Sequence, residues 1–84
     1  MIKKIGFSGF GNIATAIISA IIKADIFAKS DIYVFDTQEE KAKTAESFGI
    51  NFISSNTDLV KACDLIVLAV KPQIMSDVLA EIAP

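Results

Sequence analysis

A glycine-rich segment near the N-terminus constrains the fold of this chain more tightly than any other feature. Residues 9–14 read Gly-Phe-Gly-Asn-Ile-Ala, and we call this segment the glycine loop. The short apolar stretch 3–8 precedes it, and apolar residues at helical spacing over 12–24 follow it. A buried strand that turns sharply into a helix accounts for all of these observations. We therefore predict a strand, a tight turn at the glycine loop, and a helix.

The rest of the chain continues this alternation of strand and helix patterns. We predict further strands at 31–36, 50–53 and 65–70. Further helices are predicted at 38–48, near 57–62 with Asn56 or Thr57 as the cap, and at 72–82. Thr37 and Glu40 fit a capping box for the second helix, and Gly49 is suited to end it. The continuous apolar run 65–70 is typical of a central parallel strand covered on both faces. Residues 1–84 are thus predicted to form one α/β domain, a Rossmann-type parallel sheet with fewer than the usual six or so strands.

The glycine loop fits the pattern that binds the pyrophosphate of a dinucleotide. Gly9 permits a tight turn, Gly11 lets the backbone approach a pyrophosphate closely, and Ala14 lets the helix pack on the strand. The free amides of the first helical turn and the helix dipole favour an anion there. The predicted cofactor-binding residues of this loop are Gly9, Phe10, Gly11, Asn12 and Ile13. The alternative is a tight turn that binds no ligand.

Asp36 lies at the end of the second predicted strand, where an acidic residue can accept hydrogen bonds from the adenosine ribose. Its charge repels a 2′-phosphate, and the chain has no arginine, so NAD is favoured over NADP. Thr37, Gln38 and Lys41 are alternative, weaker partners for a 2′-phosphate. Asp36 has a second interpretation, in which it only caps the next helix.

Two more candidate positions follow later strands, at the edge where ligands sit in open α/β sheets. Backbone groups of Ala69 and Val70 are predicted to lie near the cofactor, because the Pro72 ring fixes the turn after them. Lys71 either joins this site or is a solvated lysine. Asn56 either caps the third helix or contacts the ribose, and the residues alone favour the cap slightly.

Composition excludes several classes of partner. The net charge of −2, with eight lysines as the only basic residues, leaves no basic patch for nucleic acid. Without histidine, and with Cys63 as the single cysteine, we expect neither a metal cluster nor a disulfide. Cys63 is expected simply to pack among apolar neighbours. We expect no signal peptide and no membrane span, and we expect a reducing, cytoplasmic location.

The apolar content predicts a further contact surface. Hydrophobic residues make up 52% of the 84 residues, which is more than a domain of this size easily buries. We therefore expect part of this surface to meet a second copy of the chain or a further domain.

Two segments together resemble the N-terminal domain of pyrroline-5-carboxylate reductase. Residues 4–13 read Lys-Ile-Gly-Phe-Ser-Gly-Phe-Gly-Asn-Ile, Ala16-Ile17 follow, and residues 69–73 read Ala-Val-Lys-Pro-Gln. The family typically reads Ile-Gly-Phe-Ile-Gly-x-Gly-Asn-Met and, much later, Ala-Val-Lys-Pro. The resemblance implies an enzyme of proline biosynthesis that reduces 1-pyrroline-5-carboxylate to L-proline with NAD(P)H, usually NADPH. It also implies that 9–13 bind the pyrophosphate, that Asn56 approaches the ribose or its phosphate, and that 69–72 lie along the nicotinamide.

The sequence departs from the family pattern at three positions. Ile13 replaces a methionine, Asp25 stands where a glycine often ends the first helix, and Thr37 stands where many members carry an arginine. The last departure leaves the choice between NAD and NADP open. In the family the substrate site lies in a C-terminal helical domain that also forms the dimer. These 84 residues are therefore expected to bind cofactor without reducing substrate.

Two other functions fit the same residues. The first is a related dehydrogenase of the superfamily, such as an F420-dependent NADP reductase or prephenate dehydrogenase. The second is a stand-alone nucleotide-binding module without chemistry.

Overall fold

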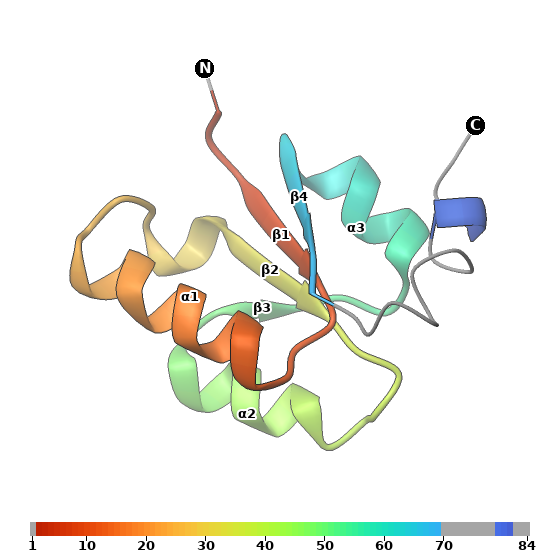
Figure 1. Cartoon of the computed structure of the whole chain (residues 1–84), viewed down its shortest axis with the longest axis horizontal. Helices are drawn as coiled ribbons and strands as arrows, with labels where there is room; N and C mark the ends of the chain where they lie inside the picture. Colours follow the sequence, from red (N-terminus) through yellow and green to blue (C-terminus); the bar gives the residue numbers. More distant parts are fainter. Residues whose placement is uncertain (1, 70–78, 82–84) are drawn as a thin grey trace.

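The computed structural model describes residues 2–69 and 79–81, which form a parallel sheet with helices on both faces (Figure 1). The strands are β1 (Ile5–Ser8), β2 (Ile32–Phe35), β3 (Asn51–Phe52) and β4 (Leu65–Leu68). The helices are α1 (Asn12–Lys23), α2 (Lys41–Phe48) and α3 (Asn56–Ala62), and a short 3₁₀ turn, η1 (Lys29–Asp31), precedes β2. The strand order is β3-β2-β1-β4, and every pair is parallel. This is the order of the first strands of a dinucleotide fold, so the predicted Rossmann-type α/β class is confirmed.

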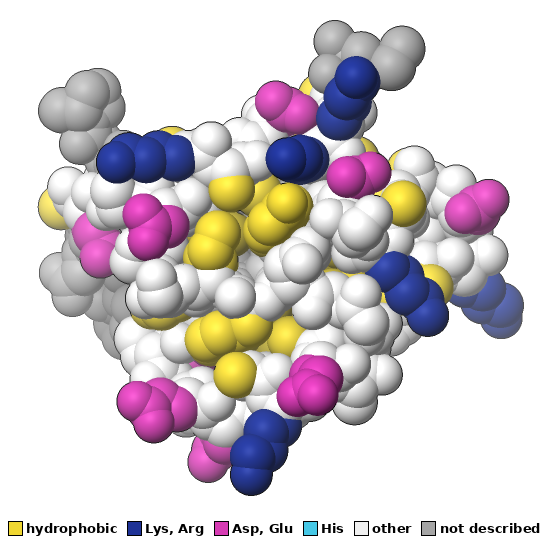
Figure 2. All heavy atoms as spheres, turned by 180° about the vertical axis from the view of Figure 1, so that it is seen from behind, with side chains coloured by type: hydrophobic (Ala, Val, Ile, Leu, Met, Phe, Trp, Pro, Cys, Tyr) yellow, Lys and Arg dark blue, Asp and Glu magenta, His cyan; other side chains and the backbone are white. Residues whose placement is uncertain are grey.

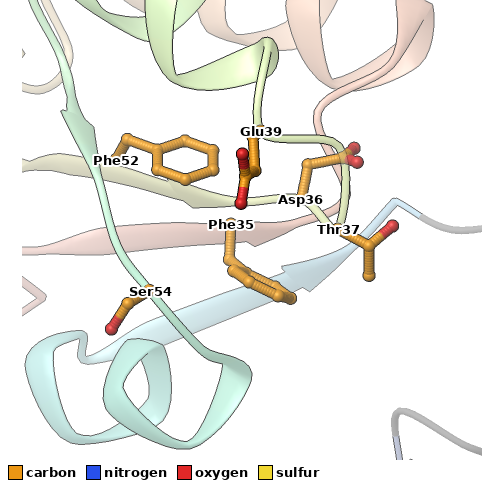
Figure 3. A pocket seen from close by; sticks show the side chains of 6 residues that line it. All are labelled: Phe35, Asp36, Thr37, Glu39, Phe52 and Ser54. Carbon is orange, nitrogen blue, oxygen red and sulfur yellow. The ribbon is translucent and has the colours of Figure 1, made fainter.

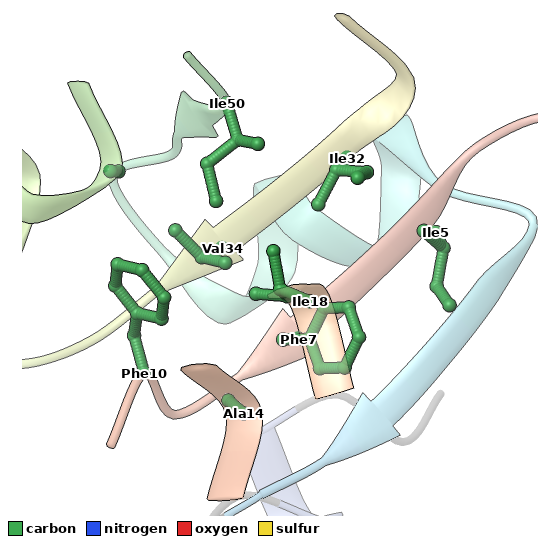
Figure 4. Packing of buried hydrophobic residues seen from close by; sticks show 9 residues of the cluster. Ile5, Phe7, Phe10, Ala14, Ile18, Ile32, Val34 and Ile50 are labelled. Atoms are coloured by element: carbon green, nitrogen blue, oxygen red, sulfur yellow. The ribbon is translucent and has the colours of Figure 1, made fainter. Parts of the chain in front are cut away.

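The alternation of side chains along β1 sends its residues to two different layers. Phe7 points toward α1 and is fully buried with Ala14 and Ile18 of that helix (Figure 4). The next residue back, Gly6, faces the other side of the sheet, where α3 packs. A Cβ atom at Gly6 would lie 2.8 Å from Cys63 Sγ and 2.9 Å from a methyl group of Leu59. Only glycine therefore lets α3 pack this closely on β1.

The first two helices end in the same backbone motif. At the end of α1, Asp25 adopts a left-handed φ of 56°, and the Ile26 amide donates to the Ile21 carbonyl at 3.2 Å. At the end of α2, Gly49 has a φ of 76°, and the Ile50 amide donates to the Ala45 carbonyl at 3.1 Å. Both are Schellman motifs, which glycine fits best. The predicted end of α2 at Gly49 is confirmed, and the departure at Asp25 falls on the corresponding position of α1.

The predicted capping box of α2 is wrong. The helix begins at Lys41, and its preceding residue Glu40 makes no side-chain cap bond. The reason lies in Asp36, whose Oδ1 accepts the Gln38 amide at 2.9 Å and folds the chain into a turn. This turn takes up the residues after β2, so Thr37 does not cap the helix.

The predicted cap of α3 also lies one residue away. Ser55, rather than Asn56 or Thr57, precedes the helix with an extended backbone, and its Oγ accepts the Asp58 amide at 3.1 Å. Asn56 is already the first residue of the helix.

The prediction that the fourth strand is central is also wrong for the described part of the sheet. Within residues 2–69 and 79–81, β4 pairs only with β1, and Leu65 is 40% exposed. A continuous apolar run indicates that both faces of a strand are covered, but it does not indicate whether the strand lies at the edge of the sheet. The predicted residues Val70, Lys71 and Pro72 lie outside the described residues, as does most of the predicted helix 72–82, of which residues 79–81 are described and helical.

Apolar side chains also remain at the surface. Seen from behind, the molecule gathers hydrophobic side chains near the centre of this face, with lysines and acidic groups around them (Figure 2). In the part of the chain that the structure describes, no helix is both long and apolar enough to cross a membrane.

Candidate dinucleotide site

The glycine loop turns the chain sharply out of β1. Gly9 has a φ of 99°, and its amide donates to the Phe35 carbonyl of β2 at 2.8 Å. The next side chain, Phe10, is 1% exposed and meets the Phe48 ring edge-on at a centroid distance of 5.9 Å. The Phe10 ring therefore anchors the loop in the core, and only its backbone belongs to the site.

The start of α1 is open to an approaching anion. A Cβ atom at Gly11 would meet nothing within 4 Å, and Ile13 is 71% exposed. Among the described residues, no side chain caps this helix end, and its first turn carries no acidic residue. The amides of a first helical turn lack partners within the helix, and the helix dipole adds partial positive charge there. This combination is suited to bind a phosphate group.

Asp36 joins the glycine loop to the loop that follows β2. Its Oδ2 accepts the Phe10 amide at 2.9 Å, while Oδ1 accepts the Gln38 amide at the same distance. A carboxylate can accept further hydrogen bonds beside these two. The structure thus gives Asp36 a clamping role and places it at the carboxyl end of β2, as predicted for a ribose ligand.

A groove opens beside this clamp. It has a volume of about 440 Å³ and lies at the carboxyl ends of β2 and β3 (Figure 3). Its lining residues are Phe35, Asp36, Thr37, Glu39, Phe52 and Ser54. The two aromatic rings lie 6.4 Å apart at a tilt of 39°, the Glu39 carboxylate stands near them, and the Asp36 carboxylate is directed away from them. Aromatic surface beside hydroxyl-accepting carboxylates suits an adenosine group.

Asn56 is buried at the same edge of the sheet, with 4% of its surface exposed. Its Oδ1 accepts the Ser8 hydroxyl at 2.6 Å, and its Nδ2 donates to Glu81 at 2.7 Å. Sequence reasoning missed Ser8 and Glu81. A polar residue that closes the otherwise apolar strand 5–8 was the available signal for Ser8, and no local pattern distinguishes Glu81.

The structure brings most of the predicted site residues to one edge. Gly9, Gly11, Asn12 and Ile13 surround the start of α1, and Asp36 and Thr37 lie next to it. The Ala69 amide donates to the Ser8 carbonyl at 2.8 Å, which fixes Ala69 beside the end of β1.

Two titrating groups lie at the opposite edge of the sheet. Burial, reinforced by the charge of Asp64, raises the pKa of the Cys63 thiol to about 11. The Asp64 carboxylate accepts the amides of Lys3 and Lys4, which lowers its pKa. Asp64 joins the starts of β1 and β4 through these bonds, and both groups lie away from the candidate site. Among the described residues, no three His, Cys, Asp or Glu side chains come together as metal ligands would.

Sheet order, glycine loop and an acidic residue at the end of β2 together define the class of Rossmann-type dinucleotide-binding domains. The chain belongs to the family described as NADP oxidoreductase coenzyme F420-dependent, whose model matches residues 4–84.

Comparison with known proteins confirms the resemblance that the sequence motifs carry. Pyrroline-5-carboxylate reductase of Escherichia coli (strain K12) is 40% identical over 83 residues, covering 98% of this chain and 31% of the relative. The enzyme of the same name from Pisum sativum is 32% identical over 80 residues, covering 95% of this chain and 29% of the relative. This chain thus spans less than a third of the length of these relatives.

Solved structures agree in fold and sequence. The crystal structure of pyrroline carboxylate reductase from Plasmodium falciparum with NADP bound has a TM-score of 0.84 and 34% identity, over 98% of this chain and 29% of that chain. A pyrroline-5-carboxylate reductase structure from Coxiella burnetii has a TM-score of 0.85 and 30% identity, over 94% of this chain and 29% of that chain.

Proposed function

We propose that this chain is the dinucleotide-binding part of an oxidoreductase that reduces 1-pyrroline-5-carboxylate to L-proline with NAD(P)H. The observation that carries the proposal is the uncapped start of α1 beside Gly11, where a Cβ atom would meet nothing within 4 Å. The named relatives, which match nearly the whole chain, support the substrate. The description of the family model favours a second candidate, an F420-dependent NADP reductase.

In this proposal each part of the site holds one part of the cofactor. Amides of residues 11–13 bind the pyrophosphate, and the groove beside Asp36 holds the adenosine. Asn56 donates to an oxygen near the ribose, and residues 69–72 lie along the nicotinamide. The bound cofactor supplies a hydride, while the residues of this chain bind and orient it.

We further propose that the 84-residue chain alone binds cofactor but reduces nothing, since it spans less than a third of its relatives. Incubation of the chain with NADPH and 1-pyrroline-5-carboxylate is expected to leave the NADPH absorbance unchanged. A cytoplasmic location remains part of this proposal.

The substitution Gly11→Asp tests the binding site without endangering the fold. Asp is a good N-cap and the position has room, so the melting temperature should stay constant or rise. The added carboxylate repels a pyrophosphate, so binding of NADH or NADPH, followed by nicotinamide fluorescence, should weaken by more than about tenfold. Gly11→Asn, with the same shape and no charge, is the matched control. Unchanged affinity in Gly11→Asp would place the ligand elsewhere.

We expect a dinucleotide without a 2′-phosphate to be preferred, because the acidic residues Asp36 and Glu39 both line the groove. Calorimetric titration should therefore give tighter binding of NADH than of NADPH. Asp36 also clamps the loop, so Glu39→Gln is the cleaner variant. It should improve NADPH binding about two- to fivefold and leave NADH nearly unchanged. Glu46→Gln, on α2, controls for net charge, and equal effects of the two variants would remove Glu39 from the site.

A further inference from the structure

Three side chains from distant parts of the sequence form a polar chain beneath the carboxyl edge of the sheet. Ser8 ends β1, Asn56 begins α3, and Glu81 belongs to the helical residues 79–81. Ser8 Oγ donates to Asn56 Oδ1 at 2.6 Å, and Asn56 Nδ2 donates to Glu81 Oε1 at 2.7 Å. Ser8 is 2% exposed and Asn56 is 4% exposed, so water does not compete freely for the bond between them. Glu81 is exposed, so its bond to Asn56 is the one that a ligand can replace.

The two bonds fix the orientation of the Asn56 amide. An ionised carboxylate only accepts hydrogen bonds, so Asn56 must direct its NH₂ group toward Glu81. Its oxygen then faces Ser8, whose hydroxyl is able to donate. Turning the amide over would set its oxygen against the Glu81 carboxylate, and two acceptors would face each other. The Glu81 carboxylate therefore sets which way the amide faces, and the hydrogen bond from the Ser8 hydroxyl to Oδ1 holds the amide in that orientation, with its donor directed away from β1.

The polar chain lies at the point of the sheet where ligands bind. The order β3-β2-β1-β4 reverses between β1 and β4, and open α/β sheets hold their ligands outside the carboxyl ends of the strands at such a point. Ser8 is the last residue of β1 and directly precedes the glycine loop. An Asn56 amide that already donates to a carboxylate oxygen is equally suited to donate to an oxygen of a nucleotide.

We propose that Ser8 is a positioning residue, which holds the NH₂ group of Asn56 toward the bound dinucleotide. In the free protein Glu81 accepts the hydrogen bond from this group, and a dinucleotide oxygen replaces Glu81 when the cofactor binds. The inference rests on the proposed function, because it assumes that a dinucleotide binds at this edge. Ser8 and Glu81 then act in opposite directions. Ser8 favours binding by orienting the donor, and Glu81 opposes binding by competing for it.

The test compares NADH and NADPH affinities of the 84-residue chain and four variants, by calorimetry on samples shown to be folded by circular dichroism. Ser8→Ala should weaken binding about fivefold, the worth of one ordinary hydrogen bond. Glu81→Ala should tighten binding by about the same factor, because its competing acceptor is gone. Ser47→Ala, which removes a hydroxyl bonded within α2, and Glu46→Ala, which removes an exposed charge, are the matched controls.

Each result bears on a separate claim. The inference is supported if Ser8→Ala binds the dinucleotide more weakly than Ser47→Ala and Glu81→Ala binds it more tightly than Glu46→Ala. A merely structural role of Glu81 would not tighten binding. If Ser8→Ala binds the dinucleotides as tightly as Ser47→Ala does, Ser8 has no positioning role. An affinity of Glu81→Ala no tighter than that of Glu46→Ala overturns the competition, and this exposed position is testable even if Ser8→Ala fails to fold. If the unaltered chain binds neither dinucleotide, the proposed function itself fails, and the inference falls with it.

Discussion

Gly6 shows how a single residue determines the packing of a whole layer. A Cβ atom there would lie within 3 Å of both Cys63 and Leu59. We expect Gly6→Ala to lower the free energy of unfolding by about 1–3 kcal/mol, as overpacked cores do. Urea unfolding measures this loss. Gly11→Ser adds a Cβ atom to an open position and should cost nothing, so equal losses in both variants would contradict the packing argument.

Cys63 gives a pH dependence whose sign follows from its environment. The folded pKa, about 11, lies above the ordinary value of 9.0, so between these values the folded state holds more protons than the unfolded state. The contribution is complete below pH 9 and is lost as pH rises toward 11. The free energy of unfolding of the wild-type chain should therefore fall more steeply over this pH range than that of Cys63→Ala. Parallel pH profiles of the two proteins would show that the thiol is not perturbed.

Whether a residue was predictable from the sequence depended on how far along the chain its partners lie. The glycine loop was predictable because its turn, its open approach and its helix start all depend on neighbouring residues. Gly6 and the Ser8–Asn56 bond were not predictable, because their partners lie about fifty residues further along the chain. The clamp from Asp36 to Phe10 joins residues 26 positions apart and was also missed, although Asp36 itself was singled out.

At the scale of elements, the end of α1 contains a correctable strain. Asp25 adopts a left-handed φ of 56°, which costs most residues about 1–2 kcal/mol but costs glycine nothing. We expect Asp25→Gly to raise the free energy of unfolding by about 0.5–1 kcal/mol, because glycine's flexibility in the unfolded chain and the tolerance of Asp offset part of the gain. Thermal unfolding measures the effect.

The Schellman motif at the end of α2 allows the opposite substitution, from glycine to a residue with a side chain. Gly49→Ala puts a side chain on a left-handed residue and should destabilise the chain by about 1 kcal/mol. If Asp25→Gly fails to stabilise while Gly49→Ala destabilises, the strain at Asp25 is absorbed by its neighbours and the argument is wrong.

The centres of the elements were predictable from the sequence, and some of their ends were not. Apolar periodicity located each described strand and helix because burial depends on the pattern of the whole segment. The starts of α2 and α3 were wrong because several polar residues compete to cap them. Ser55 caps α3, whereas Asp36 forms a turn before α2 and leaves that helix without a side-chain cap. The residue types do not specify the backbone geometry that decides this.

At the scale of the whole molecule, the outer edge of β4 is a candidate contact surface. Leu65 is 40% exposed on the edge strand of the described sheet, and unpaired apolar edges tend to associate. We propose that the 84-residue chain self-associates through this edge, and sedimentation velocity should detect the association at high concentration. Leu65→Lys should suppress it, whereas Val60→Lys, at a similarly exposed position on α3, should not. A monomer at all concentrations would contradict this proposal.

The proposed function depends on a dinucleotide binding at the start of α1. The most direct measurement is a titration of the ¹⁵N-labelled chain with NADH and NADPH, followed by the backbone amide resonances. We expect the resonances of Gly11, Asn12 and Ile13 to shift most and that of Thr37 to shift less. The resonance of Asp64, at the opposite edge of the sheet, should stay unchanged. Unchanged resonances of the glycine loop at high concentrations of both dinucleotides would contradict binding at this site.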